Sequence, residues 1–314
     1  MSTRALVVVL AALAAAAPAH ASYLVARNVA QPTLKVDAGG RALVSYTEQG
    51  RRKSVLVWGA INALEPTPGR KQVEFKRDYS GGYKSFRKRN YEKTIRNVCG
   101  AYTGPALAWL VSACTMPDGS HWALQSWQRM LPNLGITPWT ARQSAWELHV
   151  SHWTDELPRL EVYLDWVDSG RFHHLFGRFT YQDQPVYGFS ASSSGVPLDS
   201  WGRNVYLDTL DSAYGAGWKR ENSFLARNPN GNFCYGFFDH NPYPGYPAVG
   251  RRPPGVGTRY RVTALGPGVT PIVMWEGDGL PDYDPGNPDH VKLEQDMNTL
   301  ADELAAEDTG CRRG

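Results

Sequence analysis

The stretch ALAWLVSACTMPDGSHWALQSWQRM, residues 106–130, decides the fold class. It holds two apolar runs, 106–114 and 122–130, on either side of Pro117-Asp118-Gly119. A Pro-Asp-Gly turn between apolar runs is typical of two antiparallel strands joined by a short connection. The stretch therefore predicts a β-hairpin.

Similar runs recur along the chain, separated by Gly, Pro, Asn and Asp. They cover 42–46, 54–58, 146–152, 160–166, 172–181, 186–189, 205–211, 219–227, 232–238, 259–265 and 271–275. Most of them follow one another in pairs, as hairpins do. Short strands at this spacing are typical of all-β sandwiches and barrels. We therefore predict a mainly β protein, an antiparallel β-sandwich or jelly-roll-like fold with long loops.

One helix is expected, near the C-terminus. Asn287 is a favourable N-cap, Pro288 occupies the first helical position, and Asp289 lies in the first turn, where the helix dipole favours an acid. Apolar residues then recur at helical spacing, at Leu293, Met297, Leu300 and Leu304. The pattern predicts a helix that packs one stripe on the sheet.

The first 21 residues have the features of a secretory signal peptide. Arg4 precedes an apolar run over 5–17, and Ala19-His20-Ala21 is a small-x-small cleavage site. The run is too short to span a bilayer, and we expect no transmembrane segment after it. We predict a secreted or extracytoplasmic protein whose residues 22–314 form a single β-rich domain, with a small N-terminal subdomain over 22–98 as an alternative.

Four cysteines remain after the signal peptide: Cys99, Cys114, Cys234 and Cys311. An even number in an exported chain predicts two disulfides, for which three connectivities exist. Cys99 with Cys114 is the local pairing, and it would leave Cys234 to pair with Cys311. Pairing all four would leave no cysteine for catalysis, and their spacing does not fit a zinc site.

Charge is distributed unevenly along a chain of net charge +3. Residues 51–96 contain thirteen basic and four acidic residues, whereas residues 276–308 contain eleven acidic residues and a single lysine. The basic stretch, and Arg87, Lys88 and Arg89 in particular, predicts a site for a polyanion. Two alternatives stay open: both segments are simply solvated, or they face one another in the fold.

Period-two alternation places several polar and aromatic side chains on common sheet faces. Aromatic rings stack on sugar rings, while carboxylates and amides hold hydroxyl groups, so these faces are candidate carbohydrate sites. The candidate binding residues are Gln125, Trp127, Arg129, His149, Glu161, Tyr163, Asp165 and Asp208. An ordinary solvated sheet face is the alternative. By the same pattern Trp122, Trp146 and Trp166 belong to the core, and Trp127 and Trp153 to the ligand-facing set.

A secreted polysaccharide hydrolase would need two carboxyl groups about 5–9.5 Å apart. Glu161 and Asp165 are four residues apart on one strand, about 13 Å, so neither can serve the other as a catalytic partner. A pair would require a second strand, with Glu147, Asp208 or Glu221 as its source. No catalytic residue is assigned from the sequence, which favours a noncatalytic function.

We expect no metal site and no cofactor. His173 and His174 are adjacent on a strand and point to opposite faces. The segment 282–289 resembles the start of a calcium loop, but Leu293 stands where the bidentate glutamate should be. Turn formation and helix capping account for these acids without calcium.

Residues 121–133, 219–225 and 233–238 are similar to those of a family of exported bacterial proteins with no assigned function. The resemblance runs over most of the chain after the signal peptide and implies neither fold nor ligand. The sequence favours an exported binding or envelope-associated protein, with a carbohydrate or an anionic cell-envelope polymer as its ligand. A secreted polysaccharide hydrolase and a structural or protein-interaction module are the alternatives. We do not expect a nucleic acid partner, and the sequence does not determine the oligomeric state.

Overall fold

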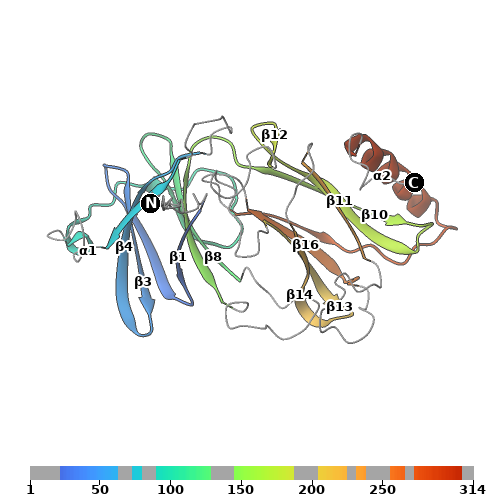
Figure 1. Ribbon diagram of the computed structural model, residues 1–314, viewed down its shortest axis with the longest axis horizontal. Coiled ribbons are helices and arrows are strands. Elements are labelled where there is room, and N and C mark those ends of the chain that lie inside the picture. Colours follow the sequence, from blue (N-terminus) through green and yellow to red (C-terminus); the bar gives the residue numbers. More distant parts are fainter. Residues whose placement is uncertain are drawn as a thin grey trace, which may run out of the picture.

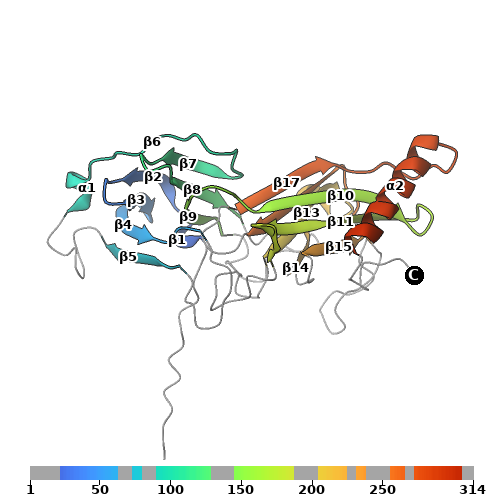
Figure 2. The ribbon, with the colours of Figure 1, turned by 90° about the horizontal axis from the view of Figure 1, so that it is seen from above.

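The structure is a computed structural model of the full chain (Figure 1). It describes residues 22–62, 73–79, 90–128, 145–186, 204–224, 231–237, 255–265 and 272–305. The fold is mainly β with antiparallel strand pairing and a C-terminal helix, as predicted. Its four sheets form two lobes side by side along the long axis of the molecule (Figures 1 and 2).

The N-terminal lobe contains two sheets. Sheet 1 has the strand order β1-β9-β8-β7-β6, with β1 Tyr23–Arg27, β6 Gly100–Ala101, β7 Leu110–Thr115, β8 His121–Trp127 and β9 Glu147–Trp153. Sheet 2 has the order β2-β3-β4-β5, with β2 Ala30–Val36, β3 Arg41–Glu48, β4 Arg51–Gly59 and β5 Phe75–Tyr79. A short helix, α1 (Tyr91–Thr94), follows sheet 2 in the chain.

The C-terminal lobe also contains two sheets. Sheet 3 comprises β10 Arg159–Val167, β11 Phe172–Tyr181, β12 Gln184–Pro185 and β15 Asn232–Gly236. Sheet 4 has the order β14-β13-β16-β17, with β13 Val205–Ser212, β14 Gly215–Phe224, β16 Arg259–Leu265 and β17 Ile272–Asp278. The helix α2 (Pro288–Leu304) contacts β10 and β11 at the far end of this lobe (Figure 2).

Each lobe has its own hydrophobic core between its two sheets. In the N-terminal lobe, Val44 and Val57 of sheet 2 belong to one buried cluster with Leu124 and Val150 of sheet 1. In the C-terminal lobe, strands of sheets 3 and 4 contribute to a second cluster, which includes Val162, Phe179, Leu207 and Val262. The alternation of apolar residues along each strand produces both clusters, because successive side chains point to opposite faces.

A small aromatic cluster joins the lobes. Trp127 on β8 is buried against Tyr206 on β13 and Leu265 on β16, and Trp109 packs beside it. The Trp127 and Tyr206 rings meet edge to face at 5.5 Å, a favoured aromatic geometry. The outer face of sheet 1 therefore abuts the other lobe, and its polar residues are not on an open surface.

The local signals in the sequence are reproduced. The turn between β7 and β8 contains Gly119 at φ 86°, a backbone conformation that favours glycine. The carboxylate of Asp118 accepts hydrogen bonds from the backbone N–H and hydroxyl of Ser120. Helix α2 begins after Asn287, whose side chain accepts from the Asp289 N–H.

One predicted pairing is wrong. Residues 219–227 and 232–238 read as a hairpin around Asn228–Gly231, but β14 pairs with β13 and β15 pairs with β11. The two strands therefore belong to different sheets. Turn residues show where the chain leaves a strand, but the next strand pairs wherever its apolar face is buried.

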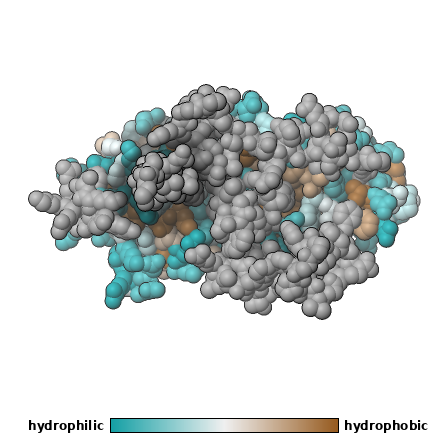
Figure 3. Space-filling view, viewed as in Figure 1, coloured by the Kyte–Doolittle hydropathy of each residue, from teal (hydrophilic) through white to brown (hydrophobic). Residues whose placement is uncertain are grey.

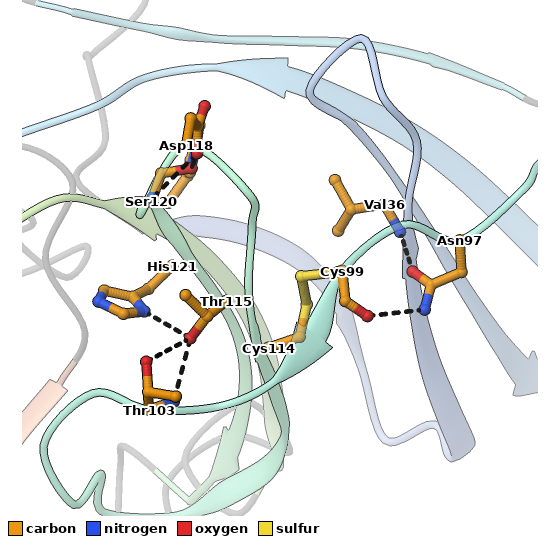
Figure 4. The surroundings of a disulfide bond; sticks show 10 residues. Val36, Asn97, Cys99, Thr103, Cys114, Thr115, Asp118, Ser120 and His121 are labelled. Atoms are coloured by element: carbon orange, nitrogen blue, oxygen red, sulfur yellow. Dashed lines mark hydrogen bonds between the residues drawn. A yellow bond between two sulfur atoms is a disulfide. The ribbon is translucent and has the colours of Figure 1, made fainter.

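The predicted Cys99–Cys114 disulfide is present and joins the start of β6 to β7 (Figure 4). Asn97 fixes the same region, because its side chain accepts from the Val36 N–H and donates to the Cys99 carbonyl. Cys234 is disulfide-bonded as well. Its predicted partner, Cys311, lies outside the described residues.

Candidate binding site

The two charged segments lie at opposite ends of the molecule. The basic segment supplies β4, β5 and α1 in the N-terminal lobe, and the acidic segment supplies α2 at the far end of the C-terminal lobe (Figures 1 and 2). The described parts of the two segments therefore do not face one another. The seven described basic residues of the basic segment are all exposed.

Part of this charge lies on one face of sheet 2. The register places Arg41, Trp58 and Lys76 in one cross-strand row, and Thr47 and Arg52 in another. Cross-strand partners share a face, and the face opposite the core is the outer one. We call the following six residues the basic face: Lys35, Arg41, Arg52 and Lys76 on sheet 2, with Lys93 and Arg96 from the segment that packs on its central strands, β3 and β4.

Five of these six cations have no acidic partner. Within the described ranges, no ion pair involves Lys35, Arg52, Lys76, Lys93 or Arg96, and all five are exposed. Arg52 donates only to the Gln31 carbonyl and the Thr33 hydroxyl. With strands about 4.8 Å apart, the charges on β2 and β5 are separated by about 15 Å across the sheet. The arrangement suits an extended anion better than a small one.

A buried apolar layer fixes the segment that carries Lys93 and Arg96. Tyr91 of α1 packs on Leu43 and Leu56, which point outward from sheet 2. Glu92 accepts a hydrogen bond of 2.6 Å from the Ser54 hydroxyl on β4. These contacts hold α1 against the outer face of sheet 2, so the segment that carries Lys93 and Arg96 is fixed on that face.

A pocket of about 390 Å³ opens at the edge of the basic face. Asp37, Arg41, Tyr91 and Arg96 contribute to its lining. The guanidinium of Arg41 lies 5.4 Å from the centre of the Tyr91 ring and forms a 2.7 Å ion pair with Asp37. The hydrogen bond to Asp37 raises the pKa of Arg41, so this side of the pocket carries a permanent cation.

Figure 3 shows where hydrophilic residues lie on one side of the molecule. Where Figure 1 places the tip of the β3–β4 hairpin, hydrophilic residues gather at the surface of the N-terminal lobe. Arg51, Arg52 and Lys53 lie at this tip and are exposed. Lys53 forms an ion pair with Glu48, which is also the cross-strand neighbour of Arg51.

The residues predicted to form a glycan face on sheet 1 share a face but are buried. Gln125 and His149 are cross-strand partners, and so are Trp127 and Glu147. Gln125, Trp127 and His149 are each no more than 2 % exposed. The alternation was correct, but the second lobe covers part of this face, which the periodicity of one strand cannot indicate.

Asp208 is buried as well, in a cluster of opposite charges. Its carboxylate accepts hydrogen bonds from Arg220 on β14 and Arg261 on β16, and all three residues are at most 7 % exposed. The Arg261 guanidinium lies 4.1 Å from the Trp218 ring centre and 4.9 Å from that of Trp109. Asp208 thus holds two arginines near the junction of the lobes.

The third predicted set lies on sheet 3. Glu161 is exposed and Tyr163 half-buried, while Asp165 is fully buried and accepts a 2.7 Å hydrogen bond from His174, its cross-strand partner. The opposite side chains of β10, among them Val162, belong to the core, as the alternation predicted. The seven candidates that the structure describes therefore occupy three different sheets and do not converge on one groove.

Four buried carboxylates of the described chain are individually engaged. Glu147 is bound by Arg27 and His149, Asp208 by two arginines, Asp165 by His174, and Glu221 by the Tyr235 hydroxyl. In none of these contacts is the partner a second carboxylate. This arrangement stabilises the fold and lacks the paired carboxyl groups that a glycosidase requires.

Three tryptophan predictions are wrong. Trp146, expected in the core, is 48 % exposed, whereas Trp127 and Trp153, expected to face a ligand, are each 1 % exposed. Trp122 and Trp166 are buried, as predicted. Trp127 and Trp153 lie on the outer face of sheet 1, which other parts of the molecule cover.

The remaining predictions concern metals, membranes and residues that the structure does not describe. Across the described ranges no three His, Cys, Asp or Glu side chains are grouped as metal ligands. In the same part of the chain no helix is both long and apolar enough to cross a membrane. Arg87, Lys88, Arg89 and Arg129 lie outside the described residues, although the first three directly precede Asn90, where α1 begins.

Sequence analysis missed two of the six residues of the basic face. Lys35 and Arg41 lie before the basic segment 51–96, on separate strands, and neither composition nor spacing links them to it. The one available signal was the alternation of side chains along each strand. It places Lys35 and Leu34 on opposite faces of the sheet, and likewise Arg52 and Lys53. No family model, no curated protein sequence and no solved structure matches this chain. The resemblance to an exported bacterial family therefore stays a prediction.

Proposed function

We propose that this protein is exported and binds an acidic polysaccharide through the basic face of its N-terminal lobe. The observation that carries the proposal is the set of five exposed cations on that face without acidic partners. Charges arranged in this way attract an anionic polymer and raise its local concentration. The signal-peptide pattern of residues 1–21 and the disulfides support an extracytoplasmic location.

The composition of the face favours a polysaccharide over a nucleic acid. Proteins that bind single-stranded nucleic acids stack the bases on exposed aromatic rings. On the described basic face Tyr91 is 6 % exposed and Trp58 is half-buried, and both belong to the layer that holds α1. Cations without a stacking platform are suited to carboxylate or sulfate groups along a sugar chain.

A hydrolase that acts on polysaccharide is supported less well. Such an enzyme needs one carboxyl group as acid and another as base or nucleophile within about 9.5 Å. Four buried carboxylates of the described chain, Glu147, Asp165, Asp208 and Glu221, instead contact an arginine, a histidine or a tyrosine. We therefore propose binding without cleavage at the basic face.

The test measures the affinity of the purified protein for polygalacturonate, with dextran as the neutral control. We expect binding to polygalacturonate only, with an affinity that falls steeply between 50 and 200 mM salt as counterions are released. The variant Lys35→Glu/Arg52→Glu/Lys76→Glu should reduce the affinity at least tenfold. Added single-stranded DNA should compete poorly.

A matched variant distinguishes this face from net charge alone. Arg159→Glu/Arg171→Glu changes two exposed arginines of the C-terminal lobe that pair with local acids. This variant should retain at least half of the affinity. Equal losses in the two variants, or equal binding to dextran, would contradict the proposal, and the release of reducing ends would establish the hydrolase instead.

A further inference from the structure

A hydrogen-bonded chain of four residues lies at the edge of sheet 1. The Ser22 hydroxyl is 3.1 Å from Nδ1 of His149, and Nε2 of His149 is 2.9 Å from a carboxylate oxygen of Glu147. Arg27 binds the other oxygen of Glu147 at 3.1 Å. Ser22, His149 and Glu147 are each at most 6 % exposed.

The chemistry of these groups sets the direction of every hydrogen bond. The Arg27 guanidinium donates to the Glu147 carboxylate, and a carboxylate bound in this way only accepts. His149 therefore donates from Nε2, and in its neutral form Nδ1 is left as the acceptor for the Ser22 hydroxyl proton. A serine that donates to an imidazole, which in turn donates to a carboxylate, is the arrangement that activates a nucleophile.

The strand register explains why these three residues meet. Glu147 and His149 are two residues apart on β9 and share a face, and β1 runs antiparallel beside them, with Leu24 opposite His149. Ser22 directly precedes β1, which is an edge strand of sheet 1. The hydroxyl is thus at the end of an edge strand, on the face where His149 points.

A second serine–histidine pair in the same lobe shows that a buried serine beside a histidine does not always donate its hydroxyl proton to the imidazole. The Ser120 hydroxyl is 3.2 Å from Nε2 of His152 but 2.7 Å from the Asp118 carboxylate, to which it donates. His152 uses its other nitrogen on the Gly59 carbonyl. The proton of Ser120 is therefore committed to a carboxylate, whereas within the described chain that of Ser22 has Nδ1 of His149 as its acceptor.

We infer that Ser22 is a catalytic nucleophile for carboxylic ester hydrolysis, with His149 as its general base and Glu147 and Arg27 as positioning residues. The inference rests on the proposed export in one respect, cleavage after Ala21. That cut removes the residue joined to the Ser22 nitrogen and leaves the serine as the first residue of the chain. Ser151, fully buried on the same face, has a hydroxyl without a hydrogen-bond partner and supplies a further polar group there.

The reaction has two balanced steps. The Ser22 oxygen attacks the acyl carbon while its proton passes to Nδ1 of His149, and the departing alkoxide then takes that proton and leaves as the alcohol. A water molecule next gives a proton to His149 and attacks the acyl-serine, which releases the carboxylic acid and restores the serine. No oxidant or additional reactant is needed.

The experiment uses chain 22–314, made in an oxidising compartment as a fusion whose removal leaves Ser22 at the amino terminus. Mass spectrometry confirms that terminus and locates any adduct formed with a fluorophosphonate probe. We expect the adduct on Ser22, together with a burst of p-nitrophenol from p-nitrophenyl acetate. Ser22→Ala should abolish both, and Ser120→Ala, the matched control, should leave both unchanged.

Two positioning variants make the test specific. His149→Gln should lower the labelling rate about 10²-fold or more, and Glu147→Gln should lower it while shifting its pH profile. Labelling of the unaltered protein should decline on acidification, because only a neutral imidazole can take the proton. The inference is overturned if the folded protein with Ser22 at its terminus gains no adduct there, or if the Ser22 and Ser120 variants label alike. Polygalacturonate binding by the same sample is a separate readout, so the two proposals can fail independently.

Discussion

The two lobes use their arginine and lysine residues in opposite ways. In the C-terminal lobe, Arg220 and Arg261 are buried on the Asp208 carboxylate and lie against aromatic rings. In the N-terminal lobe, Lys35, Arg52 and Lys76 stand exposed on the outer face of sheet 2 without acidic partners.

This difference separates charges that hold the fold from charges that are available to a ligand. Removing one member of a buried ion cluster leaves its partners desolvated and uncompensated, which is costly. Removing an exposed cation without a partner costs the fold almost nothing. Stability measurements on the two lobes can therefore test the assignment of the basic face without knowledge of its ligand.

The largest effect is expected from Asp208→Asn. The substitution keeps the size of the side chain but leaves two buried guanidinium groups without their shared carboxylate. We expect a loss of about 3–5 kcal/mol in the free energy of unfolding, measured by urea denaturation. The control is Asp296→Asn on the exposed surface of α2, which should change stability by less than about 0.5 kcal/mol. Equal effects would show that the Asp208 cluster has no special structural role.

The next largest effect concerns the N-terminal lobe. The double variant Cys99→Ala/Cys114→Ala opens a loop closed over 15 residues. In the chain-entropy model this costs about 3 kcal/mol. Thermal unfolding followed by circular dichroism, with and without reductant, measures this cost. Reductant breaks the Cys99–Cys114 bond only in the unaltered protein, so it should lower the Tm of the unaltered protein by more than that of the double variant. A double variant as stable as the unaltered protein would contradict the prediction.

A pH-dependent effect of intermediate size is expected in both lobes. Burial lowers the pKa of His152 in the N-terminal lobe and of His173 in the C-terminal lobe. The unfolded chain, with a histidine pKa of about 6.5, then binds protons more readily than the folded one. Each histidine contributes stability that is complete above about pH 6.5 and is lost as the pH falls toward its lowered value.

The size of that loss is at most about 1.4 kcal/mol per pH unit for each histidine. Urea denaturation at pH 7.5 and pH 5.0 measures it. His152→Gln and His173→Gln should each make the unfolding free energy less sensitive to acid, though both are expected to lower stability at pH 7.5. An unchanged acid sensitivity in either variant would show that the histidine is not the group that titrates.

The smallest effect is expected on the basic face. Lys35→Ala, Arg52→Ala and Lys76→Ala should each change the unfolding free energy by less than about 0.5 kcal/mol. Affinity for polygalacturonate should nevertheless fall with each substitution. A substantial loss of stability in any of the three would assign that residue to the fold and remove it from the binding site.

Much of the fold could be predicted because its signals are local. The Pro117-Asp118-Gly119 turn, the Asn287 cap of α2 and the short loop between Cys99 and Cys114 each depend on a few neighbouring residues. The pairing of β15 with β11 could not be predicted, because it depends on which distant strand buries the apolar face.

The candidate site was predicted only in outline. The uneven charge pointed to a polyanion, but the basic face takes residues from four strands and from the segment around α1. The Ser22–His149 contact spans 127 positions in the sequence, and only the pairing of β1 with β9 creates it.

The sequence by itself determined the class of the fold, its local turns and helix, and the faces that side chains share along each strand. These properties follow from backbone geometry and short-range hydrogen bonds. The tertiary structure alone decided which faces are buried. Gln125, Trp127 and His149 have the alternation of a polar surface, yet the packing around sheet 1 buries them, while Lys35, Arg52 and Lys76 remain in solvent. Burial depends on what packs against a face, and the packing partners here come from distant parts of the chain.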